Sequence, residues 1–202
     1  MTTLIKLAID NKAPSKAIAQ GIIRDLAEQH PDSVRELAQL YAYFMPPKPK
    51  KPKTAFQWVS AAAGVKDIRY YLNYVYVTAE HLTASDGHRL HRAPNTDKLA
   101  PGYYHPITGD LAHPPEYAVY PDTAKVIPAP GESVPFSLAD AEPCESRHDG
   151  PCYTVSGATM NARYVHDAMA FMPSARIQIT GADQAVRLDD GDLLAVIMPL
   201  RP

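Results

Sequence analysis

The spacing of apolar residues divides the chain into a helical first part and a body rich in strands. Within residues 1–45, apolar side chains recur at every fourth position between residues 18 and 26, which places them on one helical face. A second helix is predicted from Ser33, which can form a capping box with Glu36. Short helices bury little surface alone, so we expect this segment to pack on another part of the protein or on a second copy.

A run of proline and lysine, PPKPKKPK over residues 46–53, separates these helices from the rest of the chain. Proline favours an extended polyproline spacer, and lysines are candidates for contacts with DNA phosphates. The lysines are Lys48, Lys50, Lys51 and Lys53. A solvated linker explains the same letters, so both interpretations stay open. The predicted division is a helical segment over 1–45, a linker over 46–53 and a domain over 54–202.

The domain over residues 54–202 is predicted to alternate helices with strands. A helix is expected from Thr54 to Val65, followed by the strands YLNYVYV, HLTASD and HRLHRAP. In the proline-rich stretch that follows, EYAVY (116–120) and SVPFSLA (133–139) look like strands. A second helix begins after Asn161, which can cap it, and the strands ARIQIT, QAVRL and DLLAVIMPL complete the pattern. The fold class is therefore α+β, with two similar halves of a helix followed by strands.

Composition and charge narrow the class of protein. The chain is 46% hydrophobic and 21% charged, which is typical of a soluble globular protein. It has no apolar run of about 18 residues and no secretory signal, so we expect a cytoplasmic protein without a membrane partner. Charge is uneven: residues 1–53 carry nine Lys/Arg against five Asp/Glu, and residues 54–202 carry eleven against seventeen. The net charge of −2 does not by itself indicate a nucleic-acid-binding protein.

Both cysteines lie in one polar segment, CESRHDGPC, with His148 midway between Cys144 and Cys152. Three such side chains could ligate zinc, but a structural zinc site needs four ligands and usually has more closely spaced pairs. A structural disulfide is not expected in a reducing cytoplasm. We therefore expect two free thiols in a loop, and neither a metal nor another cofactor.

The segment ASDGHRL, residues 84–90, brings a serine, an aspartate and a histidine close together. Asp86-Gly87 between two strand patterns is typical of a β-hairpin turn. Residues so close around a turn point to different faces, whereas a Ser-His-Asp relay needs groups that converge from separate elements. The sequence also lacks the GxxxxGK[ST], GxGxxG and HExxH motifs. We therefore expect no enzymatic activity.

Five segments resemble the bacterial sliding clamp, the beta subunit of the replicative DNA polymerase, and they occur in that family's order. They are DIRYYLNYVYV (67–77), TASDGHRL (83–90), YPDTAKVIP (120–128), MNARYVHDAM (160–169) and LLAVIMPLR (193–201). The resemblance implies one DNA-clamp-like domain of two β-α-β-β-β halves after a small helical N-terminal segment. The family carries three such domains per chain. Here the first half resembles the start of the middle domain and the second half resembles the end of the last.

The resemblance also implies a cleft for short linear peptides from polymerases, clamp loaders and repair factors. Its lining would be mostly apolar with a few polar donors, which suits an anchored Leu or Phe side chain. Carried over residue by residue, the lining is Leu72, Ser85, Gly87, His88, Arg89, Leu90, Pro121, Val126, Val196, Met198, Pro199, Leu200 and Arg201. The alternative is that these residues only build a hairpin and a strand. Hairpin and tail could meet within one chain or between neighbouring copies, and the family letters retained in 120–128 favour one chain.

On the DNA-facing side, the resemblance implies basic residues that contact phosphates of duplex DNA without reading its sequence. The candidates are the four linker lysines with Lys66, Arg69 and Arg163; the first predicted helix contains no basic residue.

Two functions fit the resemblance. One is a processivity factor, a homo-oligomer whose copies assemble head-to-tail into a ring on DNA, six copies if the family's ring is kept. The other is a non-encircling clamp mimic, as a phage or mobile element would carry, that captures or competes for clamp-binding proteins.

Overall fold

The structure, a computed structural model, describes residues 51–115, 119–146 and 150–200. Residues from Lys51 onward form one compact unit. Several sequence-based predictions fall outside the described residues: the helices of 1–45, the larger part of the linker, the first three residues of the predicted strand 116–120, and the side chains of Lys48, Lys50, His148 and Arg201.

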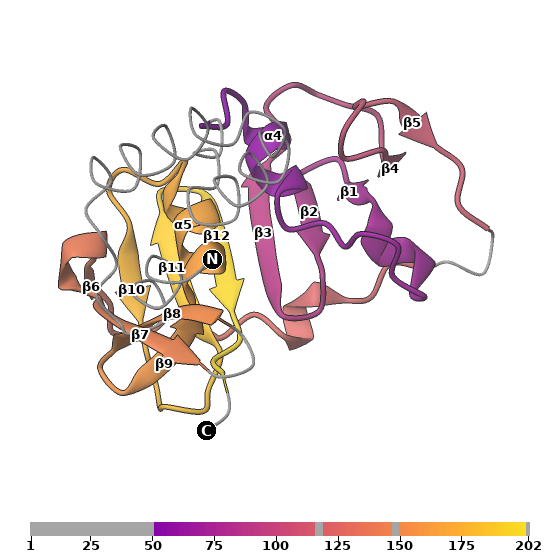
Figure 1. The fold of residues 1–202 in the computed structure, drawn as a ribbon. Helices are drawn as coiled ribbons and strands as arrows, with labels where there is room; N and C mark the ends of the chain where they lie inside the picture. Colours follow the sequence, from indigo (N-terminus) through magenta and orange to yellow (C-terminus); the bar gives the residue numbers. More distant parts are fainter. Residues whose placement is uncertain (1–50, 116–118, 147–149, 201–202) are drawn as a thin grey trace, which may run out of the picture. The chain divides into compact units, whose positions relative to one another are not determined.

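A nine-stranded antiparallel sheet organises the described part of the chain (Figure 1), in the order β5-β4-β1-β2-β3-β12-β11-β10-β6. The first half supplies β1 (Val75–Val77), β2 (His81–Ser85), β3 (Arg89–Pro94), β4 (Gly102–Tyr104) and β5 (Leu111–Ala112). The second half supplies β6 (Val134–Pro135), β10 (Arg176–Gln178), β11 (Val186–Asp190) and β12 (Leu193–Ile197). The halves join where β3 pairs with β12.

A smaller sheet lies in the second half, in the order β7-β8-β9. Its strands are β7 (Glu142–Ser146), β8 (Gly150–Val155) and β9 (Ala158–Asn161). With the helix and strands that follow, β9 begins a β-α-β-β-β sequence. In the first half the order within the described residues is a helix followed by strands. The chain is therefore α+β, with a domain body that is mostly sheet.

Both helices of this part begin where the sequence predicts. Thr54 Oγ1 accepts a hydrogen bond from Gln57 N at the start of α4 (Ala55–Ser60), and Asn161 accepts one from Arg163 N at the start of α5 (Ala162–Met169). α4 ends at Ser60, earlier than predicted, because the chain turns so that Gly64 N bonds Leu72 O.

Three predicted strands are shorter than expected or absent. Residues Tyr70–Asn73 form a 3₁₀ helix, η2, before β1, because the Asn73 amide binds the backbone of Asp67 and Tyr70. In the segment SVPFSLA only β6 is a strand, since Ser137 caps a second 3₁₀ helix, η4 (Leu138–Asp140). The described end of EYAVY, residues 119 and 120, forms no strand. A third 3₁₀ helix, η3 (Thr123–Lys125), lies in the connection between the halves.

The main core lies between the nine-stranded sheet and the two helices, and Trp58 is at its centre. Its Nε1–H donates to the carbonyls of Asp167 and Ala168 at 3.1 and 3.0 Å, so α4 is tied to the end of α5. Its ring stacks on His91 with centroids 4.5 Å apart. His91 is fully buried, and burial lowers its pKa to about 4, so the imidazole is neutral at physiological pH.

The expectation of two free thiols is wrong. Cys144 and Cys152 face each other directly across β7 and β8 and form a disulfide, with Cα atoms 5.0 Å apart. The prediction failed because it treated the segment as a loop, whereas a hairpin register places the two side chains opposite each other. Across the part of the chain that the structure describes, no group of three or more His, Cys, Asp or Glu side chains could hold a metal ion. In the same part, none of the helices has the length and apolarity needed to span a membrane.

Candidate functional site

The predicted hairpin at ASDGHRL is present and joins β2 to β3. Its last strand pair is Ser85 with Leu90, so four residues lie between the paired positions, the last of them Arg89 at the start of β3, and Gly87 alone among the four has a positive φ, +91°. The connection is therefore longer than the two-residue turn that Asp-Gly suggests. Ser85 Oγ donates to Arg89 O and accepts from Gly87 N, and Asp86 Oδ1 accepts from the backbone of His88 and Arg89. These polar side chains stabilise the turn.

Arg89 fastens this hairpin to both helices. Its guanidinium pairs with Asp86 at 3.1 Å and with Asp167 of α5 at 2.5 Å, and it donates to Ala61 O at the end of α4. Its Cζ lies 4.4 Å from the centre of the Tyr164 ring. The side chain is only 3% exposed. Arg89 therefore differs from the sequence-based expectation: it faces the helices and positions the hairpin, and it has no free surface with which to line a cleft.

The C-terminal segment lies directly beside the hairpin in the same chain. β12 pairs with β3 so that Val196 is opposite Leu90 and Ile197 is opposite Arg89. Beyond the strand, Met198 N donates to His88 O at 2.8 Å, and Leu200 N donates to Thr159 O at 2.7 Å. The two segments that the resemblance assigns to one cleft therefore meet within a single chain.

An apolar patch forms on the sheet face opposite the helices, which we call the outer face. Its buried members are Leu90, Leu194 and Val196, and Ile127 and Ala185 pack against them. The alternation of side chains along a strand explains the patch, because Ala195 and Ile197 on the same strand belong to the main core. Two predicted lining residues stay exposed, Val126 at 57% and Met198 at 43%.

The connection between the halves, residues 120–128, is fixed at both ends on this outer face. At its start, Tyr120 stacks on Tyr76 with centroids 4.8 Å apart, and its backbone N–H donates to the Tyr103 hydroxyl. Burial raises the pKa of Tyr120. At its end, Arg187 donates to Pro128 O while also pairing with Asp189. Neither the contacts of Tyr120 nor that of Arg187 was predicted from the sequence. The tyrosines at alternate positions of the predicted strand YLNYVYV were the available signal for the contact with Tyr120.

The remaining residues predicted to line the cleft differ in how exposed their side chains are. Leu72 is buried in η2 and lies outside the apolar patch as defined above. Ser85, Pro199 and Leu200 are half-buried, whereas Gly87, His88 and Pro121 are exposed. Arg92, which was not predicted, lies opposite Leu194 in the register and so places a guanidinium on the outer face.

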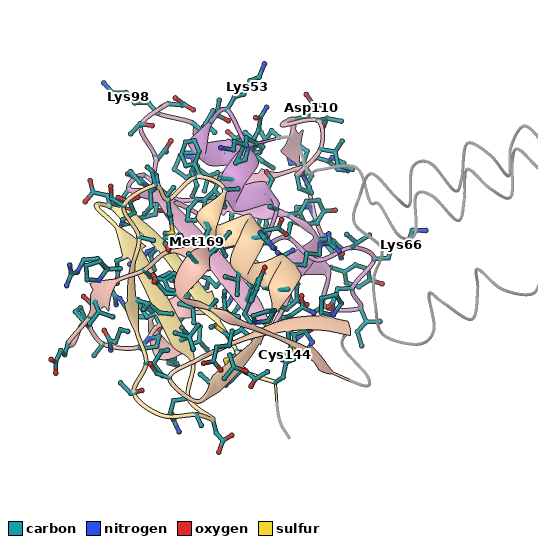
Figure 2. The ribbon with its side chains drawn as sticks, turned by 60° about the vertical axis from the view of Figure 1, so that its left-hand side comes forward. Lys53, Lys66, Lys98, Asp110, Cys144 and Met169 are labelled. Carbon is teal, nitrogen blue, oxygen red and sulfur yellow. A yellow bond between two sulfur atoms is a disulfide. The ribbon has the colours of Figure 1, made fainter. Side chains whose placement is uncertain are left out.

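The described DNA-contact candidates come from different places in the fold. Lys51, Lys53 and Lys66 are exposed, and Lys53 and Lys66 extend from separate parts of the domain (Figure 2). Arg69 pairs with Asp67 at 2.7 Å and donates to Asp86 O of the hairpin. The hydrogen bond from Arg69 lowers the pKa of Asp67 to about 2. Arg163, on α5, is 77% exposed and lies 3.7 Å from Asp167. α4, with the sequence AFQWVS, carries no charge.

Several solved structures that are similar to this chain are bacterial sliding clamps. The DNA polymerase III beta subunit of Pseudomonas aeruginosa is 14% identical over 80% of this chain and 70% of its own, with a TM-score of 0.51. The sliding clamp of Bacillus subtilis is 15% identical over 80% of this chain and 68% of its own, with a TM-score of 0.51. The beta sliding clamp of C. crescentus is 16% identical over 73% of this chain and 63% of its own, with a TM-score of 0.52.

The fold is clamp-like. No protein-family model matches the chain, and no curated protein matches it by sequence. At this level of identity the likeness to solved clamps establishes the fold alone.

Proposed function

We propose that this protein is a clamp-like accessory protein of DNA replication that binds short linear peptides of polymerases, clamp loaders or repair factors. One observation carries the proposal: the β2–β3 hairpin and the segment after β12 meet in one chain beside an apolar patch. These are the two segments that the resemblance assigns to a peptide cleft. The clamp-like fold supports the same assignment.

The chemistry of the patch suits a peptide with one or two large apolar anchors. Leu90, Leu194 and Val196 are each 3% exposed and Ile127 and Ala185 pack against them, so they form the base of the patch and not its contact surface. Met198 directly follows β12 and Val126 directly precedes Ile127; both side chains are exposed, and each loses water when an anchor covers it. The unbranched Met198 side chain can adjust to either Leu or Phe.

The proposal has two forms, which differ in whether DNA is encircled. In the first, several copies close into a ring on duplex DNA. In the second, the protein captures clamp-binding proteins without encircling DNA. The second form is favoured by the helices of the described domain, because α4 is uncharged and the exposed Arg163 of α5 has Asp167 beside it. Light scattering separates the forms: the mass of a closed oligomer supports the ring, and the mass of a 22.1 kDa monomer supports the mimic.

A peptide titration tests the binding site itself. A labelled peptide with a Gln followed by Leu and Phe anchors should bind the full chain, measured by fluorescence anisotropy. Met198→Ala should weaken binding by roughly tenfold, because truncating a buried anchor contact commonly costs about 1–3 kcal/mol. Ile107→Ala is the matched control, since Ile107 is an exposed apolar residue between β4 and β5, away from the hairpin and from the end of β12. Equal affinity of the wild type, Met198→Ala and a chain ending at Ile197 would refute the proposed site.

A further inference from the structure

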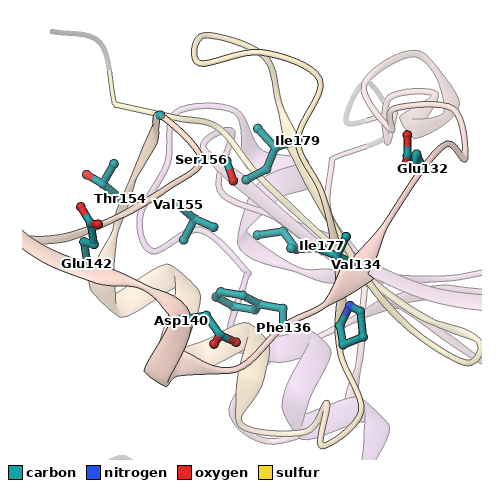
Figure 3. Close-up of a pocket in the computed structure, with 12 residues that line it drawn as sticks. Glu132, Val134, Phe136, Asp140, Glu142, Thr154, Val155, Ser156, Ile177 and Ile179 are labelled. Carbon is teal, nitrogen blue, oxygen red and sulfur yellow. The ribbon is translucent and has the colours of Figure 1, made fainter.

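A pocket of about 610 Å³ opens at the β6 end of the domain, between β6 and β10 of the large sheet and β7 and β8 of the small one (Figure 3). None of the residues predicted to line the peptide cleft contributes to it. The hairpin and tail residues of the predicted cleft lie around β3 and β12. In the sheet order, β12 is three positions away from β6, and β3 is four positions away. The pocket is therefore a second concave site, and the proposed function does not use it.

The floor of this pocket is apolar. Phe136 and Ile177 are 6% and 4% exposed, and Val155 and Ile179 pack against the same core. Figure 3 shows the side chains of Phe136, Val155 and Ile177 directed toward the middle of the pocket. Val134, opposite Ile177 in the register, is an apolar residue left 57% exposed at the rim. An apolar side chain from a ligand would extend the core that begins at this floor.

The rim carries negative charge on two sides. Asp140 and Glu142 lie on one side of the apolar floor and Glu132 lies on the other (Figure 3). The lining includes no Lys or Arg. The nearby cation, Arg176, is opposite Asp189 in the register, so it lies on the other face of the sheet from Ile177, and its Nε donates to Ser133 Oγ at 3.1 Å. Its hydrogen bonds go to Ser133, and within the described part of the chain it forms no ion pair with any of the three carboxylates.

We propose that this pocket binds a segment of a partner protein that presents one large apolar side chain between basic residues. The apolar floor accepts the side chain, and the carboxylates on both sides attract Lys or Arg residues before and after it. An extended segment can lie along β6, which ends the sheet and has no strand on its outer side among the described residues. Pro135 removes a backbone donor from that edge, so side-chain contacts rather than strand pairing determine recognition.

The chemistry of this ligand differs from that proposed for the outer-face patch. The register places Arg92, Arg187 and Asp189 around that patch, and Arg187 pairs with Asp189, so the patch has one unmatched cation beside it, whereas this pocket presents three carboxylates and no Lys or Arg. A basic peptide should therefore select the pocket. Because the two sites share no residue, the pocket can be tested independently of the proposed function.

The test uses the full chain with methyl-labelled isoleucine and a short synthetic peptide that has one Phe between two pairs of Lys. Adding the peptide should shift the methyl signals of Ile177 and Ile179 in a saturable way, and leave that of Ile107, at the β4–β5 connection, unchanged. Replacing the Phe of the peptide with Ser should weaken binding by about tenfold or more, because the apolar contact is lost.

Matched charge variants complete the test. Glu132→Gln with Glu142→Gln should weaken the peptide by about fivefold at low salt and flatten the dependence of affinity on salt. Glu80→Gln, an exposed glutamate between β1 and β2, should change neither. The proposal is wrong if the Ile177 signal does not move, if the Ser peptide binds as tightly as the Phe peptide, or if the double variant binds like the wild type.

Discussion

Arg89 and Leu90 are neighbours on one strand, yet they face opposite sides of the sheet and have different surroundings. Arg89 faces the helices, is 3% exposed, and contacts both α4 and α5 through ion pairs and hydrogen bonds. Leu90 is equally buried but faces outward, in the apolar patch that it forms with Leu194 and Val196. The inner face holds the two halves together, and the outer face carries the proposed peptide site. Stability and binding should therefore respond to different substitutions.

The largest effect is expected at Arg89. Arg89→Met removes the partner of the half-buried Asp167 and should lower the free energy of unfolding by about 3–5 kcal/mol, measured by urea denaturation. Arg92→Met is the matched control on the same strand, because Arg92 lies on the outer face and should change stability by less than about 1 kcal/mol. Equal losses in the two variants would contradict the division between the faces.

The inner face should also be sensitive to acid through His91. Its pKa in the folded state is about 4, below the ordinary value of 6.5, so folding disfavours its protonated form. Its contribution to stability is complete above pH 6.5 and is lost as the pH falls toward 4, by about 3 kcal/mol in total.

His91→Gln isolates this contribution, since glutamine can still donate to Trp58 O, the partner of His91 Nδ1. Urea denaturation of both proteins between pH 7.5 and 4.5 should give a stability difference that changes with pH in the stated direction. A constant difference across this range would mean that His91 does not titrate differently in the folded and unfolded states.

The smallest effects are expected in the tyrosines of the outer face. The buried Tyr120 hydroxyl has no hydrogen-bond partner among the described residues, so Tyr120→Phe should leave the free energy of unfolding unchanged or raise it by up to about 1 kcal/mol. Tyr103→Phe should lower it by about 1 kcal/mol, because the Tyr103 hydroxyl accepts the backbone N–H of Tyr120. Thermal denaturation would show the order, and the reverse order would contradict this reading of the connection.

Features set by neighbouring residues were predictable from the sequence. Thr54 and Asn161 cap their helices as expected, because a cap depends on a few adjacent residues. The Asp86-Gly87 hairpin is present for the same reason. The pairing of β3 with β12 joins residues about a hundred positions apart, and no local pattern indicates it; only the resemblance suggested that hairpin and tail meet.

The errors arise where register or a single side chain decides the structure. Arg89 was expected in the cleft, but strand alternation turns it toward the helices once Leu90 faces outward. Cys144 and Cys152 were expected as free thiols, but the β7–β8 register places them opposite each other. Tyr71–Asn73 was expected at the start of a strand, but the Asn73 amide stabilises a turn.

The central claim, that the outer face beside the hairpin is the peptide site, is tested most directly by methyl NMR of the methionines. The peptide with a Gln followed by Leu and Phe should shift the ε-methyl signal of the exposed Met198 in a saturable way. The signals of Met160 and Met172, both fully buried in the main core, should stay in place. A saturable shift at Met198 alone is the predicted result. No shift at Met198 while the peptide binds would place the site elsewhere and contradict the account.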